Sequence, residues 1–108
     1  MINQESIRQF VTAIKNTQEF IDLKHAKEII DQNGKLKQEL ETYQKRQADL
    51  QSSCQTMQEF EDKLTALNQK FSSLFRNPDM QQFLKASDQF GLLLMKVYQM
   101  VDESLQEI

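Results

Sequence analysis

The chain has 108 residues, with two glycines, one proline, no tryptophan and a formal net charge of −3 from interspersed acids and bases. A sheet protein of this length would need several turn-forming clusters, so their scarcity predicts one all-α domain over residues 1–108. Neither a basic stripe, a signal-peptide pattern nor an apolar run long enough to cross a bilayer occurs, which argues against direct nucleic-acid binding and membrane insertion. A single cysteine fits the reducing cytoplasm.

The first half of the chain predicts two amphipathic helices, over residues 4–15 and 18–32. In both, apolar residues recur three and four positions apart, which is the spacing of one helix face. Asn3 can cap the first helix, and the connection between the two contains neither Gly nor Pro. The second helix is expected to end at Asn33-Gly34, because both residues tolerate a left-handed backbone.

The middle of the chain predicts helices over residues 35–52 and 57–75, with apolar steps that alternate between four and three residues as in a coiled coil. The alternation slips near residues 52–56, beside a capping box formed by Thr56 and Glu59. Two antiparallel helices meeting at a tight turn are favoured over one long distorted helix. The predicted seam consists of Leu36, Leu40, Tyr43, Leu50, Cys54, Phe60, Leu64, Leu67, Phe71 and Leu74.

The last predicted helix covers residues 78–107 and starts at a capping Asn77 followed by Pro78. Residues 90–101 are apolar on nearly every side, and a helix of that kind must be covered on all sides. The rest of a chain this short can cover one side, so a second copy is expected on the other, with Gly91 permitting a close helix crossing. The residues expected in the dimer interface and core are Phe83, Phe90, Leu93, Leu94, Val97, Tyr98 and Val101.

The sequence predicts no catalytic set, no metal site and no cofactor site. His25 is the only histidine, and no second ligand stands at a metal-binding spacing from it. Cys54 lies in the seam, where a small buried thiol is the ordinary interpretation. Nine methionines and phenylalanines at helical spacing are typical of plain core, and an adaptable groove for a partner or ligand is the alternative. They are Met57, Met80, Met95, Met100, Phe60, Phe71, Phe75, Phe83 and Phe90. These observations predict a protein that is not an enzyme.

The order of the motifs resembles the YlbF/YmcA family of small bacterial helical proteins, including the YheA-type members. The motifs that carry the resemblance are Phe10-Val11-x-Ala13-Ile14-Lys15, Glu19-Phe20-x-x-Leu23-Lys24-x-Ala26-Lys27, Leu36-Lys37, Tyr43-Gln44-x-x-Gln47-x-x-Leu50-Gln51, Asn77-Pro78 and Phe83-Leu84-x-Ala86-x-x-Gln89-Phe90. Each is degenerate, but together they cover nearly the whole chain.

The resemblance implies an intertwined all-α dimer, or a larger oligomer, that regulates through protein contacts. Relatives influence competence, sporulation and biofilm formation and associate with the messenger-RNA decay machinery, so family paralogues and that machinery are the implied partners. Some regulatory relatives carry extra cysteines linked to iron–sulfur clusters, and because this chain has only Cys54, no cluster is expected. The central connection also lacks the glycine-containing turn of many relatives.

The sequence therefore favours a cytoplasmic, homodimeric regulatory or scaffold protein. A structural coiled coil or secreted helical hairpin is the alternative, although such hairpins usually carry a Trp-x-Gly turn and this chain has no Trp. A ligand- or metal-binding helical module is the third hypothesis, and stoichiometric iron or zinc in the purified protein would favour it.

Overall fold

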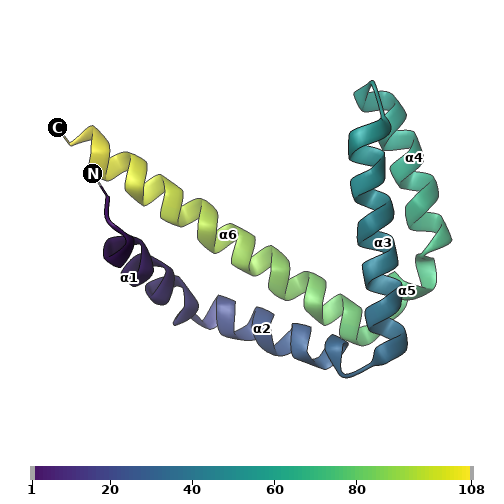
Figure 1. The fold of residues 1–108 in the computed structure, drawn as a ribbon, viewed down its shortest axis with the longest axis horizontal. Coiled ribbons are helices and arrows are strands. Elements are labelled where there is room, and N and C mark those ends of the chain that lie inside the picture. The colour runs from purple at the N-terminus through teal and green to yellow at the C-terminus, as the bar shows by residue number, and fades with distance from the viewer. Residues whose placement is uncertain (1, 108) are drawn as a thin grey trace. The chain divides into compact units, whose positions relative to one another are not determined.

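The computed structural model describes residues 2–107, and every regular element among them is a helix (Figure 1). The predicted all-α fold class is confirmed. The helices are α1 (Gln4–Lys15), α2 (Gln18–Asp31), α3 (Gly34–Ser53), α4 (Met57–Lys70), α5 (Ser72–Arg76) and α6 (Pro78–Gln106). Four of them begin and end within one residue of the ranges expected from the sequence.

The chain divides into two compact units. Residues 2–28 and 82–107 form the first unit, which we call the arm. Residues 29–81 form the second, which we call the hairpin unit because α3 and α4 are its main elements.

The arm consists of α1, most of α2 and the larger part of α6. Its buried apolar side chains are two small ones, Ala26 and Ala86. Phe20 of α2 contacts Phe90 of α6 with ring centroids 5.7 Å apart and a tilted geometry. In α1, which is strongly amphipathic, no residue is buried. The described residues of the arm therefore enclose very little core.

The hairpin unit settles the choice between one long helix and two. The turn at residues 54–56 separates α3 from α4, and the two helices pack against each other in opposite directions (Figure 1). Five seam residues are buried in this unit: Leu36, Leu40, Tyr43, Leu67 and Leu74. Ile30 and Met80 are also buried, so the larger apolar core of the described chain lies here.

Two of the predicted helix caps form as expected. The Asn3 side chain accepts a hydrogen bond of 2.8 Å from the backbone N–H of Ser6 at the start of α1. The Asn77 side chain accepts from Asp79 N–H at 2.9 Å and from Met80 N–H at 3.3 Å, with Pro78 as the first helical residue. A short polar side chain thus satisfies the free N–H groups of the first turn in each helix.

The expectation of a left-handed backbone at Asn33-Gly34 was wrong, because no residue from 2 to 107 has a positive φ. Asn33 is extended, with φ −104° and ψ 97°, and its side chain accepts a hydrogen bond of 3.2 Å from Leu36 N–H. It therefore caps the start of α3, while its backbone N–H donates to Ile30 O at 3.0 Å just after the end of α2. Gly34 becomes the first residue of α3.

The capping box at α4 forms with a shift of one residue. Thr56 Oγ1 accepts from Glu59 N–H at 3.1 Å, as predicted. The Glu59 carboxylate accepts from the backbone N–H of Gln55 at 3.3 Å, and not from that of Thr56. The turn between α3 and α4 contains no glycine, and two hydrogen bonds that join Glu59 to Thr56 and to Gln55 hold it in place.

The helix expected over residues 57–75 is interrupted at Phe71. This residue has φ −102° and ψ 25°, and the short α5 begins immediately after it. Ser72 and Ser73 follow, and serine is a weak helix former whose hydroxyl competes for backbone hydrogen bonds. The break reorients the last turn before Asn77, which carries Phe75 and Arg76.

Candidate functional site

No group of three or more His, Cys, Asp or Glu side chains in residues 2–107 could hold a metal ion. His25 is exposed, and Cys54 is a half-buried free thiol. In the same range, no helix is long and apolar enough to cross a membrane. The candidate functional features are accordingly surfaces, of which two stand out.

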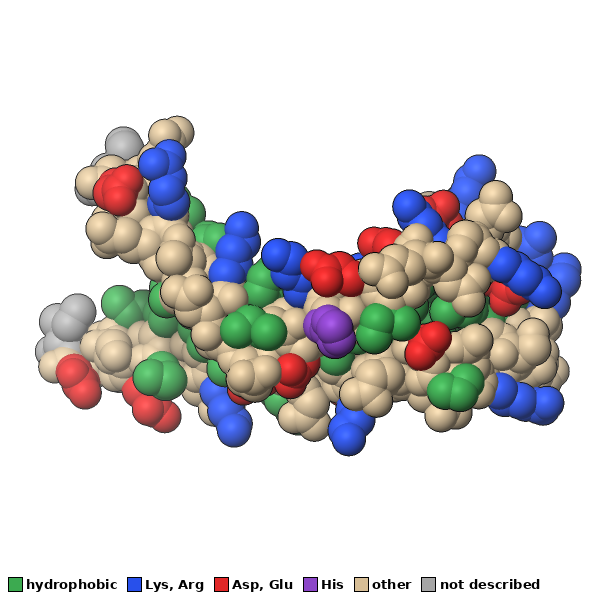
Figure 2. Space-filling model, turned by 90° about the horizontal axis from the view of Figure 1, so that it is seen from below, with side chains coloured by type: hydrophobic (Ala, Val, Ile, Leu, Met, Phe, Trp, Pro, Cys, Tyr) green, Lys and Arg blue, Asp and Glu red, His purple; other side chains and the backbone are tan. Residues whose placement is uncertain are grey.

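The first surface is the apolar exterior of the arm, visible as hydrophobic side chains between polar ones in Figure 2. Twelve of the thirteen exposed large apolar residues in the described chain belong to the arm, and Met57 is the exception. On α1, Ile7 is 53% and Phe10 49% exposed. Single exposed apolar residues are ordinary, but a set gathered on one unit marks an interaction surface.

The predicted interface residues on α6 divide into two groups. Tyr98 and Val101 are 68% and 44% exposed. The other five are partly covered within the protomer: Phe83, Phe90, Leu93, Leu94 and Val97. One side of α6 therefore faces its own protomer, and the opposite side is left open.

The open side of α6 has a regular pattern. Exposed residues follow one another at alternating steps of four and three, which is the spacing of a helix-packing seam. They are Leu84, Asp88, Gly91, Met95, Tyr98, Asp102 and Leu105. A Cβ atom built on Gly91, near the middle of this stripe, meets no described atom within 4 Å. The close crossing expected at Gly91 is thus not made by the protomer itself.

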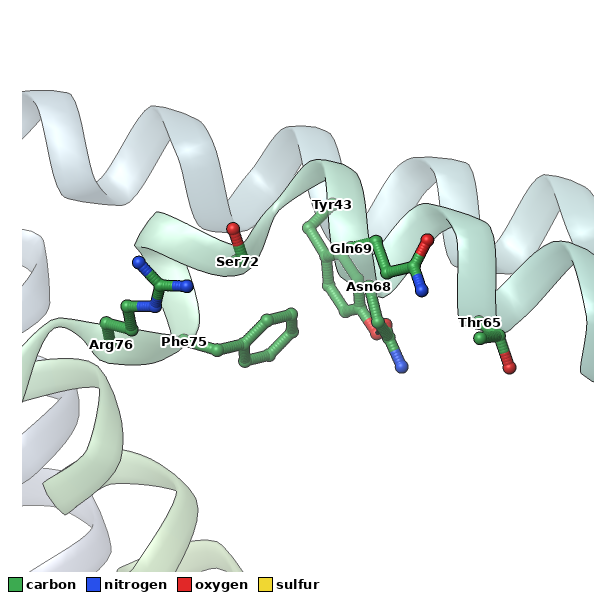
Figure 3. A pocket seen from close by; sticks show the side chains of 7 residues that line it. All are labelled: Tyr43, Thr65, Asn68, Gln69, Ser72, Phe75 and Arg76. Carbon is green, nitrogen blue, oxygen red and sulfur yellow. Dashed lines mark hydrogen bonds between the residues drawn. The ribbon is translucent and has the colours of Figure 1, made fainter.

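The second surface is a groove on the hairpin unit, with a cavity volume of about 590 Å³ (Figure 3). Tyr43 comes from α3, and the remaining side chains come from α4 and α5. The lining residues are Tyr43, Thr65, Asn68, Gln69, Ser72, Phe75 and Arg76. Arg76 carries the only formal charge among them, and it forms no ion pair with a residue in the described part of the chain.

Tyr43 organises this groove. Its ring meets Phe75 edge-on, with centroids 4.9 Å apart and planes at 86°, and meets Phe71 at 5.6 Å. Its hydroxyl donates a hydrogen bond of 2.6 Å to Asn68 Oδ1. Burial raises the pKa of the Tyr43 hydroxyl, because the charged form would lose hydration. The hydroxyl therefore serves as a fixed donor and not as an acid.

The predicted seam is only partly buried. Leu50, Cys54, Phe60, Leu64 and Phe71 are half-buried, in contrast to the five seam residues of the core. The Arg46 guanidinium lies 5.5 Å from the Phe71 ring centroid and shields that ring on one face. The sequence did not predict this groove, since the polar residues that line it have no periodic signal. Of its two aromatic residues, Tyr43 was predicted in the seam, and Phe75 was assigned to plain core with a groove as the alternative.

An exposed ion pair stabilises the turn of the hairpin. Lys63 Nζ donates to Glu59 Oε1 at 2.9 Å. This hydrogen bond, then the one from Gln55 N–H, and then the Lys63 charge lower the pKa of Glu59. In turn, the hydrogen bond to Glu59 and the negative charge of Glu59 raise the pKa of Lys63. Both groups are therefore held in their charged forms at neutral pH.

Two curated relatives and one family model match this chain. The chain is 26% identical over 99 residues to a UPF0342 protein of Caldicellulosiruptor bescii, covering 91% of this chain and 83% of that relative. It is also 26% identical over 98 residues to a UPF0342 protein of Caldicellulosiruptor saccharolyticus, covering 90% and 82%. No solved structure matches significantly. Residues 4–106 match the family described as "Control of competence regulator ComK, YlbF/YmcA", and the chain belongs to this regulatory family.

Proposed function

We propose that this protein is a non-catalytic regulator of the bacterial cytoplasm that acts as a homodimer, or a larger homo-oligomer, through contacts with other proteins. The family is described by control of the competence regulator ComK, which is a regulatory role. The resemblance seen in the sequence extends that role to sporulation, biofilm formation and messenger-RNA decay. The single observation that carries the proposal is the apolar exterior of the arm.

Leaving this apolar exterior exposed to water is unfavourable in free energy. Complete burial of one large apolar side chain is worth ~1.5–3 kcal/mol, and Phe10 and Tyr98 keep 49% and 68% of their surface exposed. Within the described arm, the fully buried apolar side chains are the two small ones of Ala26 and Ala86. A second copy offers the same surface, and a self-complementary patch is what a two-fold dimer requires.

The exposed stripe on α6 supports the same conclusion. Its seven-residue repeat matches the spacing at which two helices interlock side chains. Gly91 lies in the stripe with free space above it, so a second helix can approach closely there. We therefore assign α6 as the centre of the dimer and leave the polar faces of the other helices for further protein partners.

The test is sedimentation equilibrium of the full chain at micromolar concentration, comparing Tyr98→Lys with Gln99→Lys. Both positions are exposed in the protomer, so neither substitution should unfold it, and both add one positive charge. Tyr98→Lys should convert the dimer to a folded monomer, because it removes an aromatic contact and places a hydrated charged side chain in the interface. Gln99→Lys should leave the dimer intact. A wild-type protein that stays monomeric would refute the proposal.

The structural or secreted hairpin remains the competing function. Affinity capture from the native host, analysed by mass spectrometry, distinguishes the two. Regulators or ribonuclease components recovered with the wild type, and lost with Tyr98→Lys, favour the regulatory function. Secretion components in their place favour the alternative.

A further inference from the structure

A second groove lies between α3 and α4 of the hairpin unit, with a cavity volume of about 420 Å³. We call it the charged groove. Its lining side chains come from these two helices: Arg46, Asp49, Leu50, Lys63, Ala66, Leu67 and Lys70. The groove at Tyr43, the first groove, shares none of these residues, so the two grooves are separate features of the same unit.

The apolar residues of the charged groove suit the packing of a third helix. On α4 the lining residues recur at steps of three, one and three, which is the spacing of a single helix face. Leu67 is buried and Leu50 is half-buried, while the small side chain of Ala66 is exposed. Two antiparallel helices with such an apolar strip between them form the kind of groove in which an amphipathic helix is bound.

The end of the charged groove that lies away from the turn is basic. Arg46 and Lys70 are the lining residues of α3 and α4 farthest from the turn at residues 54–56. The Arg46 guanidinium is 5.5 Å from the centroid of the Phe71 ring, and Phe71 follows Lys70 in the chain, so the two bases stand close together. Neither base forms an ion pair with a residue in the described part of the chain.

The end nearer the turn carries mixed charge. Asp49 lines it on α3, and Lys63 lines it on α4 in an ion pair with Glu59. Asp62 lies four residues before Ala66, on the same side of α4. Near the turn, three carboxylates therefore accompany one base, whereas two bases without a lining acid occupy the far end.

The remaining acids of α3 and α4 face elsewhere. Glu39 lines a different pocket at the start of α3. Glu41 is four residues before Lys45 and shares a helix face with that base. Glu61 is four residues before Thr65, which lines the first groove. The carboxylates of a partner would therefore meet the two bases at the far end without a competing acid in the groove lining.

We propose that the charged groove binds an acidic amphipathic helix of another protein. The apolar stripe of that helix covers Leu50, Ala66 and Leu67. Its carboxylates are gathered at one end and pair with Arg46 and Lys70. Carboxylates at its other end would meet the acids near the turn, so the groove discriminates against a helix that is acidic throughout. This proposal rests on the protein-contact function proposed above and names the chemistry of the partner.

The test is binding of a synthetic amphipathic peptide to the full chain, measured by fluorescence anisotropy. The peptide carries leucines at the spacing of one helix face, glutamates in its first two turns and glutamines at the other polar positions. We expect saturable binding that weakens with added salt, because salt screens the charge pairs. A peptide with glutamine in place of every glutamate should bind about fivefold more weakly.

Variants of the chain locate the binding. Arg46→Gln with Lys70→Gln removes both bases, and Ala66→Gln fills the apolar strip, so each should weaken peptide binding by about tenfold. All three positions are exposed, so the fold should be retained, which circular dichroism checks. Lys37→Gln with Lys45→Gln is the matched control, since it removes two exposed bases of α3 that line neither groove. The control should bind the peptide as the wild type does.

The possible results separate this proposal from the dimer. A wild type that does not bind the peptide, or groove variants that bind it as tightly as the control, overturn the proposal, and a dimer that persists leaves the homodimer standing. Sedimentation equilibrium of the groove variants gives a second check, because a monomeric variant would mean that a second copy fills the groove. Wild-type binding to phosphatidylserine vesicles in place of the peptide would also overturn the proposal, in favour of a lipid surface.

Discussion

The Tyr43 hydroxyl donates a 2.6 Å hydrogen bond to Asn68 Oδ1 across the hairpin, between residues 25 positions apart in the chain. This bond joins α3 to α4 at the level where Phe75 packs edge-on against the Tyr43 ring. One side chain therefore supplies a buried apolar contact, a polar link and the floor of the groove.

Substitution of Tyr43 should separate these contributions. Tyr43→Phe keeps the ring contacts and removes the hydrogen bond to a partner that water can reach, so it should cost ~0.5–1.5 kcal/mol of unfolding free energy. Tyr43→Ala also removes the buried ring and should cost ~3–5 kcal/mol. Urea unfolding followed by circular dichroism measures both, and equal losses would show that the ring contributes little.

The two glycines of the chain form a matched pair for a test of the dimer. Neither has a described atom within 4 Å of a built Cβ, so Ala at either position gains helix propensity, up to ~1 kcal/mol, without a clash in the protomer. If a second α6 crosses at Gly91, Gly91→Ala should weaken dimerisation while raising helix content. Gly34→Ala, at the start of α3, should leave dimerisation unchanged. An unchanged or tighter dimer with Gly91→Ala would place the crossing elsewhere.

The cap at the start of α6 should contribute measurably to stability. Asn77→Ala frees the N–H groups of Asp79 and Met80, which should cost ~1 kcal/mol and lower the Tm by ~4–8 °C. Asn16→Ala is the control, because Asn16 is exposed and follows α1 at its C-terminal end. Thermal unfolding monitored by circular dichroism should separate the two variants clearly.

The Glu59–Lys63 pair predicts a defined pH dependence at the turn of the hairpin. The folded pKa of Glu59 is lowered, so its stabilising effect is present above the ordinary Glu value and is lost as pH falls through the lowered pKa. The folded pKa of Lys63 is raised, so its effect is lost only as pH rises through that raised pKa. The pair therefore stabilises the turn throughout the neutral range.

An NMR titration of the Glu59 side chain provides the measurement. Its midpoint should lie below the ordinary value in the wild type. In Lys63→Met the midpoint should move upward. The hydrogen bond from Lys63 and the charge of Lys63 are both removed, while the hydrogen bond from Gln55 N–H remains. A midpoint that does not respond to Lys63→Met would contradict the pairing.

The helices and two of their caps could be predicted from the sequence because those signals are local. Asn3 and Asn77 act on N–H groups within three residues of themselves, so the chain order alone reveals them. α2 ends at Asp31, just before Asn33, but the role of Asn33 as the cap of α3 was missed, because Asn suits the end of one helix and the start of the next equally well. The break at Phe71 was missed, since it has only a weak signal in the two serines that follow.

Short-range sequence patterns could not predict the groove or the division of the chain into two units. Tyr43 meets Asn68 and Phe75 only because α3 and α4 pack together, and the register of that packing depends on the whole set of buried side chains. The heptad pattern predicted ten seam residues, of which five are buried in the hairpin unit. It did not reveal that the rim would be polar or that Arg76 would lie at its end.

The absence of any buried residue in α1 has a consequence for how the protein responds to its own abundance. A helix of 12 residues is marginal by itself in water, and contacts within the protomer bury none of its side chains. Any partner that covers Ile7 and Phe10 thus also orders α1, so folding of this segment and association are one linked equilibrium. If that partner is a second copy of the chain, the ordered fraction of α1 rises with protein concentration. The helix content of α1 would then depend on how much of the protein is present.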